Sequence, residues 1–174
     1  MNKTSLKIAT ALLSVIFVLS VFPNVKVNAA ASGTCGDKVT WSFDGSTLTI
    51  AGEGPMYDYN ETPFFEELAD GLPIILHINN VIIENGVTSI GNRAFSGVKL
   101  TSITIPDSVT SIGASAFEGC VSLTSITIPT RVTSIGYSAF AACSSLTSID
   151  IPQGVTSLGN IAFSSCSSLT RVTI

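Results

Sequence analysis

A 23-residue repeat in the second half of the chain constrains the fold more than any other feature. A full copy reads Leu-Thr-Ser-Ile-Thr-Ile-Pro, then Val-Thr-Ser-Ile-Gly, then Ala-Phe and a cysteine. Copies begin at Leu100, Leu123, Leu146 and Leu169, and a variant copy begins at Ile78. Such a period is typical of a solenoid, in which units stack because none can bury its apolar face alone.

Each copy predicts one short strand and two corners. In Ile103-Thr104-Ile105 the side chains alternate, as a half-buried strand requires. A proline then ends the strand because it has no N–H to donate, and a glycine marks the other corner, where positive φ or close backbone approach is needed. The prolines are Pro106, Pro129 and Pro152, and the glycines are Gly91, Gly113, Gly136 and Gly159. We therefore expect residues 77–174 to stack parallel strands joined by short helical or irregular turns, with each Ala-Phe in a helical turn that packs its phenylalanine inward.

Residues 1–30 have the pattern of a secretory signal peptide. Two lysines precede an apolar run from Ile8 to Phe22, and small residues suited to cleavage follow near Ala30. A retained membrane anchor is the alternative, but the run is short for a bilayer core, so we expect no membrane span after cleavage. Cleavage would leave five basic against twelve acidic residues. This acidic balance argues against nucleic acid as a partner.

Residues 31–76 do not follow the repeat, and we expect them to cap its first turn. Val39–Phe43 and Leu48–Ile50 alternate around the tight-turn pair Asp44-Gly45, which predicts a β-hairpin. Thr62-Pro63 followed by Phe64 to Leu68 has the capping hydroxyl, proline and early carboxylates of a short helix. Together they would cover the apolar end that a first repeat leaves open.

The repeat Leu-x-x-Ile-x-Ile-Pro-x-x-Val-x-x-Ile-Gly-x-x-Ala-Phe-x-x-Cys resembles the BspA-like leucine-rich repeat of bacterial secreted and cell-surface proteins. The segment from Ser32 to Asp37, with Trp41 and the later Gly52–Tyr59, also resembles the segment that often precedes these repeats. The resemblance implies a leucine-rich-repeat solenoid behind an N-terminal cap. It also implies a non-enzymatic interaction or adhesion module that binds a protein or glycan on a host cell, on matrix or on a neighbouring bacterium.

The chain departs from ordinary leucine-rich repeats after the strand. Where those repeats place an asparagine or cysteine, this chain has Ser108, Arg131 and Gly154, so no buried asparagine ladder is expected there.

The cysteines and the single histidine give no sign of a catalytic or metal site. Cys120, Cys143 and Cys166 recur at the repeat period, but Val98 takes their place in the first repeat, which favours buried apolar thiols over pairing or metal binding. Cys35 is a lone candidate for pairing. His77 has no partner at motif spacing, so no cofactor is expected.

Acidic residues of the cap could in principle form a glycosidase pair, but a solvated surface explains them better because nothing sets their separation. These residues are Glu53, Asp58, Glu61, Glu66, Glu67 and Asp70.

The outward side chains of the repeat strands form the candidate binding face, as two columns of mostly small hydroxyls. They are Ser102, Thr104, Ser125, Thr127, Ser148, Asp150, Arg171 and Thr173. The alternatives are a merely solvated surface on a passive structural spacer, or the targeting region of a longer surface enzyme. Because the fifth copy stops after its strand, we also expect either further protein or self-association at that end.

Overall fold

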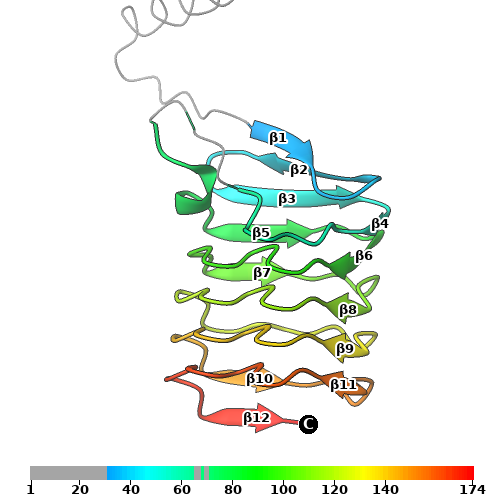
Figure 1. The fold of residues 1–174 in the computed structure, drawn as a ribbon, viewed down its shortest axis with the longest axis vertical. Helices are drawn as coiled ribbons and strands as arrows, with labels where there is room; N and C mark the ends of the chain where they lie inside the picture. Colours follow the sequence, from blue (N-terminus) through cyan, green and yellow to red (C-terminus); the bar gives the residue numbers. More distant parts are fainter. Residues whose placement is uncertain (1–30, 65–67, 69–70) are drawn as a thin grey trace, which may run out of the picture.

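The computed structural model describes residues 31–64, 68 and 71–174. These residues form a tall stack of β-strand turns with the cap at one end (Figure 1). The predicted signal peptide, residues 1–30, lies outside the described residues. The predicted leucine-rich-repeat solenoid of parallel strands is confirmed.

One side of the stack carries the strands that the repeat pattern predicted. A five-stranded sheet has the order β1-β2-β3-β5-β7, and a two-stranded sheet, β10-β12, continues the same column (Figure 1). The bounds are β1 Ala31–Thr34, β2 Val39–Phe43, β3 Thr47–Gly52, β5 Asn80–Ile83, β7 Ser102–Thr104, β10 Ser148–Asp150 and β12 Arg171–Thr173. The strand predicted for the copy that begins at Leu123 is not found, because residues 125–128 lie between β7 and β10 without strand pairing.

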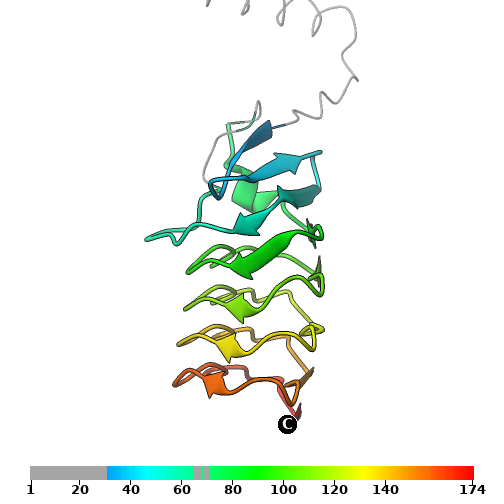
Figure 2. The ribbon, with the colours of Figure 1, turned by 90° about the vertical axis from the view of Figure 1, so that its right-hand side faces the viewer.

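A second parallel sheet runs along the neighbouring side, and the sequence patterns did not predict it. Its order is β11-β9-β8-β6-β4 (Figures 1 and 2). The bounds are β4 Gly54–Pro55, β6 Val87–Ile90, β8 Ser111–Ile112, β9 Ser134–Ile135 and β11 Ser157–Leu158. The register pairs serine with serine and isoleucine with isoleucine in successive turns. All of these strands except β6 have two residues, which are too few for the alternation by which strands are recognised.

The cap forms the predicted hairpin and joins the solenoid by strand pairing. Strands β2 and β3 are antiparallel, and β3 pairs in parallel with β5, the first strand of the repeats. The predicted helix is not found in the described part of its range. Thr62 and Phe64 are buried without helical structure, residues 65–67 lie outside the described residues, and a single 3-10 turn, η1, spans Ile74–Leu76 instead. Thr62 Oγ1 donates a hydrogen bond to Ala94 O at 3.1 Å, so this hydroxyl ties the cap to the first turn rather than capping a helix.

A continuous ladder of phenylalanine rings fills the core. One phenylalanine per turn stacks on the next at centroid distances of 5.3 to 6.0 Å, and the ladder contains Phe64, Phe95, Phe117, Phe140 and Phe163. The cap supplies Phe64, and Trp41 meets its ring edge-on at 5.7 Å and 86°. The expectation that Ala-Phe packs the ring inward is confirmed, although the segment forms irregular turns rather than a helical one.

The corner glycines are required by close packing rather than by positive φ. A Cβ on Gly113 would lie 2.6 Å from Asn92 N, and one on Gly159 would lie 2.3 Å from the carbonyl carbon of Gly136. Neither glycine has a positive φ. Successive turns therefore touch backbone to backbone at this corner, and any side chain there would push them apart.

Candidate binding surfaces

The structure places the eight predicted face residues on the outward side of the first strand column. Ser102 and Thr104 lie on β7, Ser148 and Asp150 on β10, and Arg171 and Thr173 on β12, whereas Ser125 and Thr127 lie in the stretch without strand pairing. All are exposed except Ser148, which is half-buried. The register aligns Ser148 with Arg171 and Asp150 with Thr173, so the two expected columns form.

This face, the strand face, is longer than the repeat pattern predicted. Ser102 and Thr104 pair with Asn80 and Ile82 on β5, which in turn pair with Thr47 and Thr49 on β3. The columns continue through Ser42 on β2 to Ser32 on β1, and both of these serines are exposed. The hairpin was predicted from the alternation in Val39-Thr40-Trp41-Ser42-Phe43. The same alternation also indicates which side chains of this strand face outward and so continue the strand face. The cap and the repeats thus share one surface of mostly small polar side chains, with Ile82 exposed among them.

A hollow of about 260 Å³ indents the strand face where strand pairing is lost. Thr127 and Asp150, both predicted face residues, line it together with Ile126 and Pro152. Asp150 supplies the only charge among its lining residues.

Other threonines hold the turns together and are not part of the strand face. Thr101, Thr147 and Thr170 each donate a side-chain hydrogen bond to the carbonyl oxygen of the equivalent residue one turn earlier, at 3.1 to 3.3 Å. A second ladder does the same at the other corner through Thr110, Thr133 and Thr156. The repeat pattern does not reveal these roles, because a hydroxyl that bonds internally recurs with the same period as one that faces solvent.

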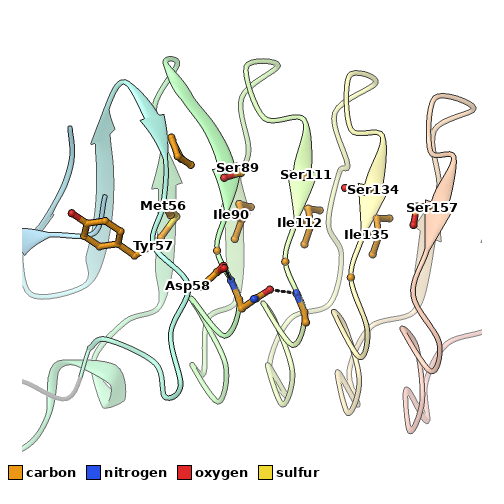
Figure 3. Close-up of a pocket in the computed structure, with 16 residues that line it drawn as sticks. Met56, Tyr57, Asp58, Ser89, Ile90, Ser111, Ile112, Ser134, Ile135 and Ser157 are labelled. Carbon is orange, nitrogen blue, oxygen red and sulfur yellow. Dashed lines mark hydrogen bonds between the residues drawn. The ribbon is translucent and has the colours of Figure 1, made fainter. Parts of the chain in front are cut away.

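A groove of about 660 Å³ runs along the second sheet and was not predicted. The four serines that open or line the short strands, Ser89, Ser111, Ser134 and Ser157, lie in a row along it (Figure 3). Corner glycines line its side, and Tyr57 and Asp58 of the cap close one end. Asp58 is the one charged residue in the lining, and its Oδ1 accepts a hydrogen bond from Asn92 N at 2.8 Å. One acid considered for hydrolysis therefore has a structural partner.

The model of one protein family, described as the BspA type leucine rich repeat region, matches residues 75–174 in six copies. This match covers more than half of the chain. The chain belongs to the BspA-type leucine-rich repeat family.

Solved structures of other bacterial leucine-rich repeat proteins resemble this BspA-type chain. A leucine-rich repeat protein from Eubacterium ventriosum matches with 28% identity over 83% of this chain and 40% of its own, at a TM-score of 0.67. A leucine-rich cell surface protein from Faecalibacterium prausnitzii matches with 28% identity over 80% of this chain and 38% of its own, at 0.57. The T. pallidum leucine-rich repeat protein matches with 26% identity over 85% of this chain and 70% of its own, at 0.57.

The chain thus spans about two fifths of the first of these relatives. No curated protein sequence matches it at a significant level.

The cysteines of these BspA-type repeats are free thiols that bond to the backbone. Cys120, Cys143 and Cys166 each donate to the carbonyl oxygen of the phenylalanine in the preceding turn, at 3.0 to 3.2 Å. Burial raises the pKa of Cys143 to about 12, and that of Cys35, also free and buried, to about 12. Such thiols are protonated at neutral pH and are poor nucleophiles and poor metal ligands.

Among the described residues, no group of three or more histidine, cysteine or acidic side chains is placed to hold a metal ion. Ser108 partly replaces the asparagine of ordinary leucine-rich repeats, because its hydroxyl accepts from Gly86 N and donates to Val87 O. Glu66, Glu67 and Asp70 lie outside the described residues.

Proposed function

We propose that this BspA-type protein is a secreted or cell-surface module that binds its partner through the strand face and catalyses no reaction. The partner would be a protein or glycan on a host cell, on matrix or on a neighbouring bacterium. The observation that carries the proposal is the length of the strand face, which extends from Ser32 in the cap to Thr173 in β12. Extended surfaces of this kind are what solenoids use for binding.

Two further observations support an extracellular place. The pattern of residues 1–30 is that of a signal peptide. The similar protein of Faecalibacterium prausnitzii is described as a cell surface protein. In the described part of the chain, no helix has the length and hydrophobicity that crossing a bilayer requires.

The two alternatives make different predictions. A passive spacer would bind nothing through the strand face. The targeting region of a longer surface enzyme would still bind, but a catalytic domain would be encoded beyond Ile174. Sequencing the gene past that codon separates a hydrolase domain from further repeats or a wall anchor.

Charge placed on the strand face tests the proposal. We expect the Thr104→Glu/Thr127→Glu variant of the 174-residue chain to lose most of its binding to cultured epithelial cells and to a solubilised basement-membrane matrix. The reason is that both side chains are exposed on the strand face, so two carboxylates there disturb contacts without disturbing the core. Flow cytometry with fluorescently labelled protein measures the loss.

The matched control is Ser164→Glu/Ser168→Glu, which adds the same two charges to exposed turn residues outside the strand face. It should bind as the unaltered chain does. Equal binding by all three proteins would place the binding site outside the strand face, and no binding by any of them would support the spacer.

A further inference from the structure

The ladder of hydrogen bonds between strands is interrupted at one turn of the strand face. Strands β5 and β7 pair above this turn and β10 and β12 pair below it, but residues 125–128 pair with neither side (Figure 1). Within the part of the chain that the structure describes, no backbone N–H or carbonyl group of residues 125–128 has a hydrogen-bond partner. Ile126 and Ile128 are nonetheless only 8% and 5% exposed. Unpaired backbone groups in buried residues are rare, so we expect a ligand or water to satisfy them.

The hollow of about 260 Å³ lies beside these unpaired groups. Its lining comes from residues 126–128 and 130 of one turn and from residues 150–152 of the next. The hollow therefore lies where ladder bonds between these two turns would otherwise run. The isoleucines of its lining are buried, whereas Thr127 and Asp150 are exposed. A group that enters the hollow meets apolar surface and free backbone groups together.

Asp150 gives the hollow a negative charge at a position of the repeat that otherwise holds threonine. Its equivalents in the other copies are Thr104, Thr127 and Thr173. The Asp150 carboxylate forms no salt bridge or hydrogen bond with any described residue. The cation of the strand face, Arg171, is in register with Ser148 and so lies in the other column. The carboxylate is thus free to pair with a cation that comes from outside the chain.

An arginine side chain satisfies every kind of group that the hollow presents. Its guanidinium holds several N–H donors in a planar fork, so it can pair with a carboxylate and donate to carbonyl oxygens at the same time. Its aliphatic stem and flat faces pack well on apolar surface. The free N–H groups of residues 125–128 can in turn bond carbonyl oxygens of the peptide that carries the arginine.

Other cations fit this hollow less well. A calcium ion takes about 6–8 oxygen ligands, and Asp150 would supply the only carboxylate among the lining residues. A lysine ammonium is more strongly hydrated than a guanidinium and lacks its planar fork, so it gains less from an apolar hollow with several acceptors.

We propose that this hollow receives an arginine side chain of a partner protein. The guanidinium pairs with the Asp150 carboxylate and donates to free carbonyl oxygens of residues 125–128, while the stem packs on the buried isoleucines and Pro152. This inference rests on the function proposed for the strand face, because the arginine belongs to the partner bound there. It identifies that partner as a protein with an exposed arginine rather than a glycan.

Nuclear magnetic resonance titration of the isotope-labelled 174-residue chain tests the hollow. The probe is the peptide acetyl-Gly-Gly-Arg-Gly-Gly-amide, and we expect saturable shifts confined to the amides of residues 125–130 and 149–152. The peptide with citrulline in place of arginine, which has a similar shape and no charge, should bind at least about fivefold more weakly. Asp150→Asn should weaken binding of the arginine peptide by a similar factor and leave the melting temperature unchanged, because Asp150 is exposed.

The matched control is Asp107→Asn, which removes the same charge at an exposed corner residue outside the hollow. It should bind the arginine peptide as the unaltered chain does. The proposal is overturned if the arginine peptide causes no shifts, if the citrulline peptide binds equally well, or if Asp150→Asn binds normally. Equal binding of the peptide with lysine in place of arginine would overturn the assignment to arginine.

Cell binding of the same variants separates this inference from the proposed function. We expect Asp150→Asn to bind cells or matrix at least about fivefold more weakly than Asp107→Asn does. Cell binding that Asp150→Asn leaves unchanged would overturn the role of the hollow and leave the strand face as the binding surface. Binding of the arginine peptide without any binding to cells or matrix would support arginine recognition and overturn the proposed function. Thr104→Glu/Thr127→Glu cannot separate the two, because Thr127 lines the hollow and a bulkier glutamate there obstructs it.

Discussion

The turn that follows each buried phenylalanine holds one residue in the left-handed region, and the chain fills this position differently along the stack. It is Gly97 at φ 74° and Gly119 at φ 73°, but Ala142 at φ 57° and Ser165 at φ 61°. A side chain costs roughly 1–2 kcal/mol in this conformation, whereas glycine enters it freely. At this position the later turns therefore carry backbone strain that the earlier turns avoid.

A reciprocal pair of substitutions tests this difference. Ala142→Gly should raise the free energy of unfolding, and Gly119→Ala should lower it, each by about 1 kcal/mol. A Cβ on Gly119 would meet Gly97 Cα at 3.7 Å, an ordinary contact, so the cost there comes from φ alone. Urea unfolding followed by circular dichroism measures both changes.

Ala141 is the control for this pair because it lies in the same turn without positive φ. Ala141→Gly should destabilise by about 0.5–1 kcal/mol, through the greater freedom of the unfolded chain. A stabilising Ala141→Gly would mean that glycine helps this turn independently of φ.

At the scale of the element, the phenylalanine ladder is the feature on which each turn depends. Phe117 is fully buried between rings at 5.5 and 5.3 Å, whereas Phe163 is half-buried and stacks on Phe140 alone. Removing a ring that is enclosed on both sides leaves a cavity, while removing one at the end of a ladder lets its neighbour be solvated.

We expect Phe117→Ala to lower the free energy of unfolding by about 3–5 kcal/mol and Phe163→Ala by roughly half as much. Urea titration monitored by circular dichroism gives both values, and Trp41 fluorescence reports whether the cap unfolds with the repeats. Equal losses for the two variants would show that the ladder does not carry the stability of the turns.

Strands long enough to show alternation could be predicted from the sequence, and the short strands of the second sheet were missed. The strand at Ser102–Thr104 and the hairpin at Val39–Phe43 followed from alternation, and the inward phenylalanines followed from their fixed offset. The two-residue strands of the second sheet, such as Ser134–Ile135, are too short to alternate.

Of the two candidate sites, the strand face was predicted from the sequence and the groove was not. The outward residues of the strand face were placed correctly, although their binding role stays a prediction. The groove was missed because its lining combines residues that lie far apart in the sequence, such as Asp58 and Asn92, which the repeat pattern does not bring together. The helix expected from Thr62 was wrong in its described part because tertiary contact with Ala94 outweighed a local capping signal.

At the scale of the whole molecule, the buried thiols link stability to pH. Burial raises the pKa of Cys35 and of Cys143 to about 12, against an ordinary value of 9.0. Folding therefore favours the protonated thiols. Their contribution to stability is fully present below pH 9 and is lost as pH rises from 9 towards 12, because the unfolded chain releases these protons first.

We expect the free energy of unfolding to fall between pH 9 and pH 10.5 by up to about 1.4 kcal/mol per pH unit for each such thiol. Urea unfolding in the presence of a reducing agent measures this slope. Cys143→Ala should give a shallower slope even though it is less stable at pH 7. An unchanged slope in that variant would assign the alkaline loss to other groups.

The hydroxyl ladder through Thr110, Thr133 and Thr156 joins each turn only to the turn before it, and the same bond recurs in three successive turns. A chain built in this way can lengthen by duplicating one 23-residue unit, and each duplication adds one more rung of identical chemistry without disturbing those already present. The lengths of the strand face and of the groove are thus set by the number of copies of the repeat. A change in the number of repeats can therefore change the length of partner that these surfaces contact, without any change in the shape of a pocket.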